Sequence, residues 1–576
     1  MPPHLLSLLA LMLMLTVVHA AAQTPTLDIT GADSRLADNI RAYVDIADES
    51  CQGGSWRLRA IARKLDDNIT QAGRALGYYH MTVDKSFAQE ENCWRLQLAV
   101  EPGEPTRLSE ISLALLEEGE SDGELQRVLQ GHGLNRGDVL HHGRFDSFKS
   151  RLLSAASARG YFDADYATSE VLVSLEEKLA RVNMRLDTGP RYRLGAIEVT
   201  HDILDAAFID RYLTDFQTGQ HYQAADLERL RREFRSGGYF EAVRVVPDLQ
   251  ERTDGQVPVV IDLTGGPRHS YSAGAGYATD IGPRVRLGYE NRYINQRGHT
   301  LSAYTNIAEN VTTYQLTYGI PMRRPAYDQL RLFTGFDQEK LNDWQSDRLA
   351  TGVQYSTWHK GNWLSTYGLN VEREDYRFGE APSRRAEMVI PSWSASLTRG
   401  PESNYPLSGW SLLVRFKGAS EDLGSSTDFV QAFGRLKYIQ KLGAGRLLLR
   451  AEGGVTEVDD FTALPVSLRF FAGGDASVRG YGYKTLGPLN EDALVVGGSR
   501  LLTTSVEYDY RVYGDWALAI FLDQGNAFHD GDYERYRGVG AGVRWVSPVG
   551  PVRVDIAHAL DGERGWRLHL SVGPDL

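Results

Sequence analysis

Arg479 stands near the end of a glycine-rich string, Arg469-Phe-Phe-Ala-Gly-Gly-Asp-Ala-Ser-Val478-Arg479-Gly480-Tyr481. Glycine and aspartate interrupt a β-rich run there, so the backbone can turn back tightly with positive φ. A guanidinium held at such a turn presents a planar fork of donors, which suits a carboxylate partner. The string therefore predicts a fixed ion pair, and an ordinary glycine-rich turn is the alternative. The candidate loop residues are Arg469, Phe470, Gly473, Gly474, Val478, Arg479, Gly480 and Tyr481.

Two acids that follow in the sequence are candidate partners for Arg479. Asp523 interrupts an apolar strand in Phe521-Leu-Asp-Gln-Gly525, and Glu507 lies in an alternating segment. Both acids could instead face water inside a barrel, so the residues alone leave the pairing open. Because a barrel lumen is wetter than a protein core, we expect such a pair to contribute nearer the ~1 kcal/mol of an exposed ion pair than the ~3–5 kcal/mol of a buried one.

Enzyme chemistry is not indicated by the sequence. The C-terminal region has no Gly-x-Ser-x-Gly elbow, no His-Glu-x-x-His motif and no phosphate-binding Gly-x-x-x-x-Gly-Lys motif. The net charge of −13 argues against a nucleic-acid binder, which would normally present a basic face. We therefore expect neither an enzyme nor a bound cofactor or metal.

The N-terminal residues predict export. Leu5–Val18 is apolar and Ala20–Ala22 offers a cleavage site, so residues 1–22 are expected to be a signal peptide, although no Lys or Arg precedes the apolar run. In an exported protein the only two cysteines, Cys51 and Cys93, are expected to form a disulfide that stabilises by roughly 4 kcal/mol in the loop-entropy model. No later stretch approaches 18 consecutive apolar residues, so membrane insertion would have to use strands.

Three repeats fill the N-terminal half. The triplets Gly77-Tyr-Tyr79, Gly160-Tyr-Phe162 and Gly238-Tyr-Phe240 recur about 80 residues apart. Each triplet follows an amphipathic run of helical period and precedes an alternating segment, which predicts the order strand, two helices, strand, strand. By themselves the repeats indicate three small α+β domains. Their expected limits are 24–104, 105–190 and 191–267.

From residue 268 to residue 576 the hydrophobic pattern changes to period two. Val506, Tyr508 and Tyr510, for example, alternate with polar residues along one segment. About sixteen such segments, at about 19 residues per strand and connection, predict a 16-stranded antiparallel transmembrane β-barrel. A soluble sandwich alternates in the same way, but the export signal and the aromatic residues on the apolar face favour a membrane barrel.

The string from Arg469 to Tyr481 resembles the conserved loop of the outer-membrane insertase superfamily, which includes BamA, TamA and the two-partner secretion transporters. The three N-terminal repeats are similar to the POTRA domains of that superfamily. Their number, together with the Gly573-Pro-Asp-Leu576 ending, favours its TamA branch. The ending departs from the terminal aromatic residue that is common in bacterial outer-membrane proteins.

The resemblance implies a site, a location and partners. In that family the loop folds into the barrel lumen, so Arg479 is expected to dock on Asp523 and Glu507, with Phe521 and Gly525 completing the strand motif. The expected location is the outer membrane of a Gram-negative bacterium, with the POTRA domains in the periplasm. The implied partners are a TamB-like inner-membrane protein, outer-membrane lipid and client outer-membrane proteins, autotransporters included.

The first and last barrel strands contain residues that weaken strand pairing. Gly274 and Gly276 lie in the first strand, and Gly573 and Pro574 end the last one. A weak seam between these strands could open sideways and offer an edge to an incoming strand. The sequence therefore favours a factor that inserts or secretes outer-membrane proteins. A passive channel, a two-partner-type secretion pore and a structural tether across the periplasm are the alternatives.

Overall fold

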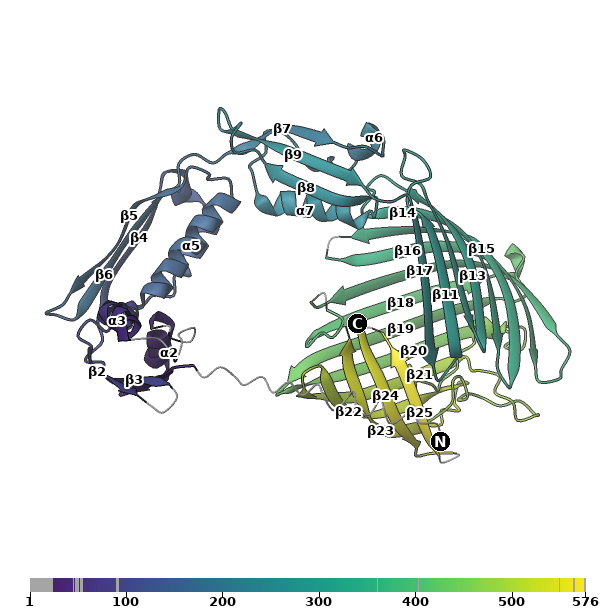
Figure 1. Ribbon diagram of the computed structural model, residues 1–576. Coiled ribbons are helices and arrows are strands. Elements are labelled where there is room, and N and C mark those ends of the chain that lie inside the picture. Colours follow the sequence, from purple (N-terminus) through teal and green to yellow (C-terminus); the bar gives the residue numbers. More distant parts are fainter. Residues whose placement is uncertain are drawn as a thin grey trace, which may run out of the picture. The chain divides into compact units, whose positions relative to one another are not determined.

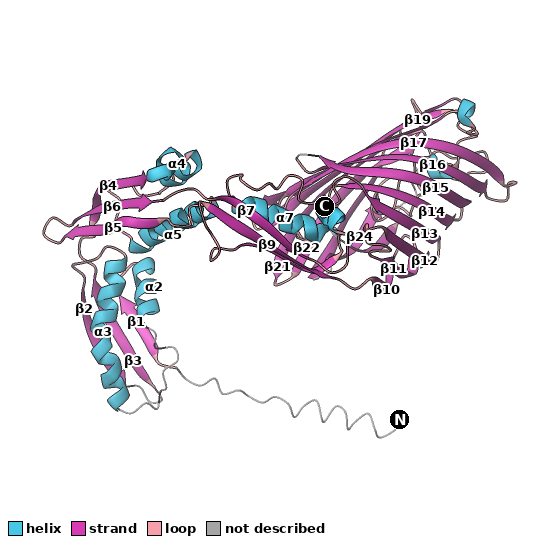
Figure 2. Cartoon of the chain, turned by 90° about the horizontal axis from the view of Figure 1, so that it is seen from above, coloured by secondary structure: helices cyan, strands magenta, loops and turns pink. Residues whose placement is uncertain are grey.

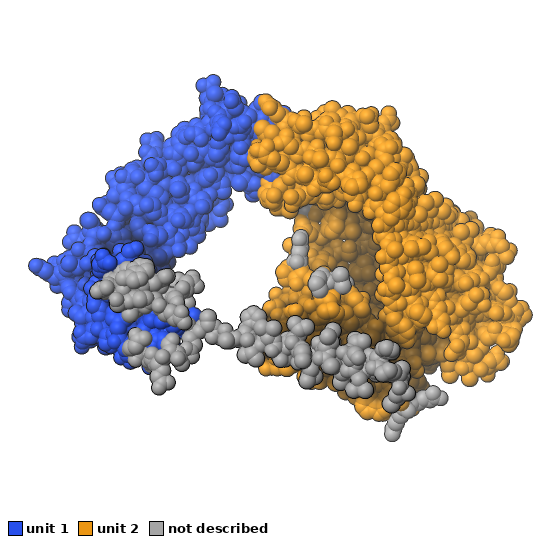
Figure 3. Space-filling model, in the orientation of Figure 1, with its two compact units in different colours: residues 1–197, 218–227, 247–259 blue, residues 198–217, 228–246, 260–576 orange. Residues whose placement is uncertain are grey.

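The computed structural model describes residues 24–44, 46, 51, 55–89, 93–359, 361–401, 403–547, 550–562 and 565–573. The predicted signal peptide, residues 1–22, and Pro574 lie outside the described residues. The chain separates into two compact units, made of residues 1–197, 218–227 and 247–259 and of residues 198–217, 228–246 and 260–576 (Figure 3). None of the described helices is long and apolar enough to cross a membrane.

The first small domain consists of β1 (Thr26–Thr30), α2 (Ser34–Tyr43), α3 (Ser55–Ala75), β2 (Thr82–Gln89) and β3 (Trp94–Glu101). Its sheet has the order β1-β3-β2, with β1 parallel and β2 antiparallel to β3, and the two helices lie against it (Figure 2). Burial alternates along β3, so Trp94, Leu96, Leu98 and Val100 pack against the helices and form the core.

The second small domain consists of β4 (Arg107–Leu116), the 3₁₀ helix η1 (Glu117–Ser121), α4 (Gly123–Gln130), α5 (His142–Ala158), β5 (Asp165–Ser174) and β6 (Leu179–Asp187), with the sheet order β4-β6-β5. Asp122 caps α4 by accepting hydrogen bonds from the N–H groups of Glu124 and Leu125. The same carboxylate accepts from Arg159 Nε at 2.7 Å and from the Tyr161 hydroxyl at 3.1 Å. The aromatic residue of the second triplet thus joins α5 to the start of α4.

The third small domain consists of β7 (Arg193–Thr200), α6 (Ala206–Ile209), α7 (Ala224–Ser236), β8 (Phe240–Pro247) and β9 (Gln256–Gly265), with the sheet order β7-β9-β8. The glycines that open the three triplets, Gly77, Gly160 and Gly238, have φ of +88°, +94° and +73°. Each lies where a helix ends and the chain turns toward a strand, which favours glycine. The predicted element order is present in all three domains.

The remaining strands form one antiparallel sheet in sequence order, which curls into a barrel (Figure 1). They are β10 (His269–Ala278), β11 (Gly282–Asn291), β12 (Thr300–Ala308), β13 (Val311–Pro321), β14 (Asp328–Lys340), β15 (Trp344–His359), β16 (Trp363–Phe378), β17 (Arg384–Arg399), β18 (Gly409–Ala419), β19 (Phe429–Leu442), β20 (Gly445–Val458), β21 (Arg500–Tyr513), β22 (Trp516–Phe528), β23 (Tyr536–Ser547), β24 (Gly550–Ala559) and β25 (Trp566–Val572). The 3₁₀ helices η2 (Glu421–Leu423) and η3 (Val466–Leu468) lie between strands. The prediction of three α+β repeats followed by a sixteen-stranded barrel is confirmed.

The two faces of the barrel sheet differ as the period-two pattern requires. On β21, Val506 and Tyr510 are about half exposed, whereas Glu507 and Asp509 are buried. Ile520 on β22 and Ile556 on β24 are likewise exposed. Exposed apolar side chains and buried charged ones on the same strands mean that the outer face meets lipid and the inner face encloses polar groups.

One long connection enters the barrel. Residues 459–499, between β20 and β21, are named here the lumenal loop. Ser467 donates to Glu374 on β16, Lys484 pairs with Glu339 on β14, and Gly480 donates to His569 on β25. Contacts with strands from distant parts of the sheet place this loop across the interior.

Candidate functional site

Arg479 of the lumenal loop meets carboxylates from three strands. Its Nε and Nη2 donate to Asp523 Oδ2 and Oδ1 at 2.7 and 3.0 Å, which is the bidentate arrangement. Its Nη1 donates to Glu507 Oε2 at 2.7 Å and to Asp555 Oδ2 at 3.0 Å. Its own backbone N–H also donates to Asp523 Oδ2 at 3.1 Å. The inner face of the barrel therefore binds both the guanidinium and the backbone of Arg479.

Strand register explains why these acids converge. Ser505 and Asp523 face each other across the β21–β22 ladder, and Glu507 faces Phe521. All four side chains lie on the inner face, since residues two apart on a strand share a side. Ser505 Oγ donates to Asp523 Oδ1 at 2.6 Å, and Arg479 Cζ lies 3.3 Å from the centre of the Phe521 ring.

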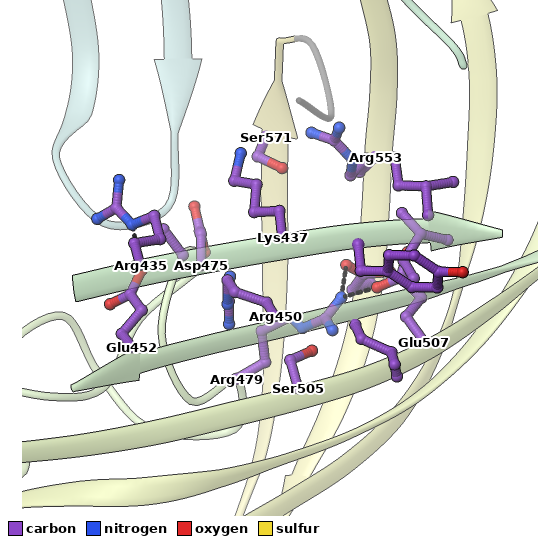
Figure 4. Close-up of a pocket in the computed structure, with 16 residues that line it drawn as sticks. Arg435, Lys437, Arg450, Glu452, Asp475, Arg479, Ser505, Glu507, Arg553 and Ser571 are labelled. Carbon is purple, nitrogen blue, oxygen red and sulfur yellow. Dashed lines mark hydrogen bonds and ion pairs between the residues drawn. The ribbon is translucent and has the colours of Figure 1, made fainter. Parts of the chain in front are cut away.

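The ion pair is largely buried, whereas a hydrated pair is expected from the sequence. Arg479 is 5% exposed and Asp523 is fully buried. A cavity of about 290 Å³ lies on the open side of Arg479, where Figure 4 shows Arg479, Ser505 and Glu507 among its lining residues. Arg479 and Asp523 are thus more buried than a hydrated lumen implies, although the cavity borders the ion pair on one side. The expected contribution of nearer ~1 kcal/mol stays a prediction.

Two members of this network were not singled out from the sequence. Arg544 on β23 is fully buried and donates through Nη2 to Glu507 Oε1 at 2.8 Å and through Nη1 to Asp555. Glu507 and Asp555 thus each lie between two guanidiniums. The only available signal was that Arg544 and Asp555 sit at inward positions of alternating strands, which is true of many lumenal charges.

Strand β23 presents a row of glycines beneath the docked loop. A Cβ at Gly538 would lie 1.8 Å from the Arg479 carbonyl oxygen, and a Cβ at Gly540 would lie 2.4 Å from the Phe521 ring. At Gly542 it would lie 1.8 Å from Asp555 Oδ1. These glycines are not among the residues singled out from the sequence; their period-two spacing is a signal that could have indicated a surface approached closely by another segment.

The other predicted loop residues shape the lumenal loop. Arg469 is buried and donates to the carbonyls of Leu464 and Val496 at 2.8 and 3.1 Å, which joins the beginning of the loop to its end. Phe470 packs against the Cα of Gly454 on β20. Tyr481 donates to the carbonyls of Arg537 and Asp561 at 3.0 and 2.9 Å.

Turns and burial account for the remaining loop positions. Gly473 and Gly474 have φ of +96° and +103°, and a Cβ at Gly473 would lie 2.3 Å from the Gly482 carbonyl oxygen. Val478 is fully buried, and Gly480 has φ of +98° against the backbone of β24. Gly525, which ends the strand motif, lies against Thr503 on β21. Bulkier residues would separate the loop from the wall.

The predicted seam residues lie at the two ends of the barrel sheet. No ladder joins β10 to β25 among the described residues. Gly274 and Gly276 face Arg286 and Arg284 within a continuous β10–β11 ladder, so the glycines leave that side intact. Gly573 follows the last residue of β25, and its carbonyl accepts from Arg553 Nη2 at 3.0 Å.

The two cysteines lie in the first small domain. Cys51 and Cys93 form a disulfide with a Cα–Cα distance of 4.5 Å. Cys93 packs at the margin of the core that α2, α3 and β3 enclose. The bond joins the segment before α3 to the start of β3, far from the lumenal site in sequence.

A barrel with an arginine-bearing loop inside it, preceded by three small α+β domains, defines an outer-membrane protein of the POTRA–barrel class. Residues 294–574 match the Omp85 superfamily domain, and residues 26–102 match POTRA domain TamA domain 1. The chain belongs to the Omp85 superfamily. Its barrel is an outer-membrane barrel, and its POTRA domains are periplasmic.

Known proteins agree with this assignment. The chain is 24% identical over 379 residues to outer membrane protein assembly factor BamA of Nitratidesulfovibrio vulgaris, covering 61% of this chain and 46% of the relative. It is 24% identical over 382 residues to the chloroplastic outer envelope protein 80 of Arabidopsis thaliana, covering 58% and 49%. The chain thus spans about half the length of these curated relatives. The crystal structure of BamA from Haemophilus ducreyi lacking POTRA domains 1–3 shares the fold, with a TM-score of 0.65, 16% identity and coverage of 81% and 99%.

Proposed function

We propose that this protein inserts β-barrel proteins into the outer membrane, or secretes their passenger segments, through the seam between β10 and β25. The observation that carries the proposal is the sheet order, which among the described residues leaves β10 and β25 without a ladder between them. Unpaired strand edges recruit extended polypeptide through backbone hydrogen bonds. The assembly role in the name of the BamA relative supports the same reading.

The likeness of the first domain to a TamA domain supports a proposal for the clients and the partner. The first domain matches a TamA POTRA model, and this supports autotransporters as clients and a TamB-like inner-membrane protein as partner. No nucleotide-binding motif is present in the sequence. The free energy for client insertion would therefore come from client folding and from burial of apolar surface in lipid. The proposed domain limits are 24–104, 105–190 and 191–267 for the POTRA domains and 268–576 for the barrel.

An engineered disulfide across the seam tests the proposal. Cysteine pairs placed between β10 and β25 should abolish client insertion when oxidised, and reductant should restore it. A control pair at Gln345 and Arg377, which face each other across β15 and β16, should leave insertion unchanged in both states. Reductant also opens the native disulfide, so the chain without an engineered pair is treated in parallel. Full insertion with a quantitatively locked seam would exclude lateral opening.

The second candidate is a passive channel or a two-partner-type secretion pore. A polar cavity of about 840 Å³ in the lumen favours it, with Glu290, Arg331, Arg348 and Lys417 among its lining residues. Single-channel recordings separate the candidates. A wide, steady and selective conductance supports the pore, whereas crosslinks from the Gly274 position to client C-terminal strands support insertion.

A further inference from the structure

In the part of the chain that the structure describes, hydrogen bonds of side chains join the two ends of the barrel sheet, and no ladder does. Leu570 of β25 donates its backbone N–H to Thr279 Oγ1, beyond the end of β10, at 3.1 Å. Thr279 Oγ1 in turn donates to Asp475 Oδ1 of the lumenal loop at 2.8 Å. His569 Nδ1 of β25 contacts the same oxygen at 2.6 Å. One carboxylate oxygen thus touches both sides of the seam.

The hydrogen positions on His569 follow from its second nitrogen. The backbone N–H of Gly480 donates to His569 Nε2 at 2.9 Å, so Nε2 is an acceptor. Nδ1 must then carry hydrogen and donate it to Asp475 Oδ1, because a ring nitrogen without hydrogen would repel that oxygen. His569 is 2% exposed and lies at the edge of a cavity of about 380 Å³, which Thr279 and Asp280 also line.

A second carboxyl group lies beside this contact. Asp280, in the turn between β10 and β11, accepts the backbone N–H of Asp475 through Oδ2 at 2.8 Å. Burial, and next the Asp475 carboxylate, raise the pKa of Asp280 above its usual range. Asp280, Asp475 and His569 have oxygen and nitrogen atoms within 4.8 Å of one another, the spacing of a cation site. However, both nitrogens of His569 already take part in hydrogen bonds, so the ring has no free nitrogen to bind a cation. We therefore interpret the three residues as a hydrogen-bonded cluster.

We propose that Asp475 closes a latch that ties the end of β10, the lumenal loop and β25 together, and that the seam opens only when these bonds break. The latch consists of Thr279, Asp280, Asp475, His569 and the Gly480 N–H. Because Gly480 follows Arg479, the docking site and the seam share one short stretch of loop. A client strand that displaces Leu570 from Thr279 would weaken the hydrogen bonds that hold the lumenal loop at the seam. Release of the loop would in turn expose the edge of β25 for pairing. The inference extends the proposed function to the residues that hold the seam shut.

Seam width is measured on the protein alone, in lipid nanodiscs and without a client. Spin labels at Tyr271 on β10 and Leu568 on β25, both exposed, report the distance between the strands. The native cysteines are bonded to each other and do not take label. We expect Asp475→Ala to raise the wide-seam population several-fold. Asp492→Ala, an exposed acid of the same loop, should leave the distribution unchanged.

Three outcomes would overturn the latch. The first is an Asp475→Ala protein that is folded by heat-modifiability and has the parent distribution. If that variant does not fold, the conservative variant Thr279→Val is measured instead, and a distance distribution equal to that of the parent protein would again overturn the latch. The second is an equal widening by Asp492→Ala, which would show a non-specific effect of loop charge. The third is widening of the parent protein by EDTA, which would show that a divalent cation holds the residues together.

The seam readout also separates the latch from the proposed function. A widened seam with unchanged client insertion would uphold the latch and refute seam-limited insertion. An unchanged seam with lost insertion would overturn the latch and leave the proposed function standing.

Discussion

At the scale of single residues, Arg479 is held by charge and by packing together. Its guanidinium meets Asp523, Glu507 and Asp555 and covers the Phe521 ring. Removing one partner of a buried ion pair typically costs about 3–5 kcal/mol, since the survivor stays buried without its counter-charge. Here Arg544 still contacts Glu507 and Asp555, so Asp523 is the carboxylate that would lose its guanidinium partner, while Ser505 and the backbone N–H of residue 479 still donate to it.

Arg479→Ala should leave a folded, heat-modifiable barrel with a released lumenal loop and reduced client insertion. Arg479→Lys should rescue only in part, because an ammonium cannot form the bidentate fork. Asp523→Ala should reproduce the defect, and the double variant should lose little more than either single one. The measurement is a double-mutant cycle on insertion, with protease protection of the loop in parallel.

Arg435→Ala is the matched control for Arg479→Ala. Arg435 also pairs with an acid in the lumen, Glu452 at 2.6 Å, but its side chain is 42% exposed. Its loss should cost less than the loss of Arg479, because Arg435 has one carboxylate partner and is partly exposed, and should leave the loop protected. Strictly additive losses at positions 479 and 523 would mean that the two residues act independently.

Asp122 in the second POTRA domain gives a pH prediction outside the membrane. Burial opposes its ionisation, but hydrogen bonds from Arg159 and from the N–H groups of Leu125 and Glu124 outweigh burial and lower its pKa. A depressed acid pKa stabilises the folded state above the unfolded pKa of about 3.9, and this stability is lost as the pH falls further. Urea unfolding followed by a fluorophore in this domain should show the loss below pH 4.

Asp122→Asn serves as the control in the same experiment. The amide keeps the shape of the cap but cannot titrate, so the variant should be less stable at pH 7 by about 1 kcal/mol or more and should lose part of the acid dependence. An identical acid profile in the two proteins would assign the acid loss to other carboxyl groups.

At the scale of elements, β23 limits how closely the loop can approach. Gly538→Ala should displace the loop, since the added methyl would lie 1.8 Å from the Arg479 carbonyl oxygen. We expect faster proteolysis of the lumenal loop and reduced insertion while the barrel stays folded. Gly434→Ala on β19 is the matched control, because the nearest atom to its added methyl is the Leu413 oxygen at 4.0 Å. Equal protection in both variants would contradict a role for the glycine row.

Periodicity predicted the elements better than it predicted the contacts between them. Alternation identified the barrel strands and the inward side of Glu507 and Asp523, because a strand fixes which side chains share a face. It could not show that Asp555 joins them, since that depends on the register of strands two ladders apart. Nor could it show that Arg479 is buried, because that burial depends on packing by the loop itself.

At the scale of the whole molecule, stability is divided between separate cores. The core of the first domain includes Leu36, Leu65 and Leu96 and contains no barrel residue. Replacing Cys51 and Cys93 by serine should therefore destabilise the first domain by up to about 4 kcal/mol and leave heat-modifiability of the barrel unchanged. Domain-resolved hydrogen exchange and gel mobility measure the two effects. Loss of the barrel together with the first domain would show that the cores are coupled.

The sequence separations of the docking contact and of the seam contact imply an order of folding. Arg479 and Asp523 are 44 residues apart, whereas Leu570 and Thr279, which meet at the seam, are 291 apart. Chain-closure entropy makes the second contact costlier by about 2 kcal/mol, and contacts of long range generally form late. The loop would then dock on β21–β24 while the sheet is still open. The growing barrel would close around a loop already in place, with no need to thread it through a finished lumen.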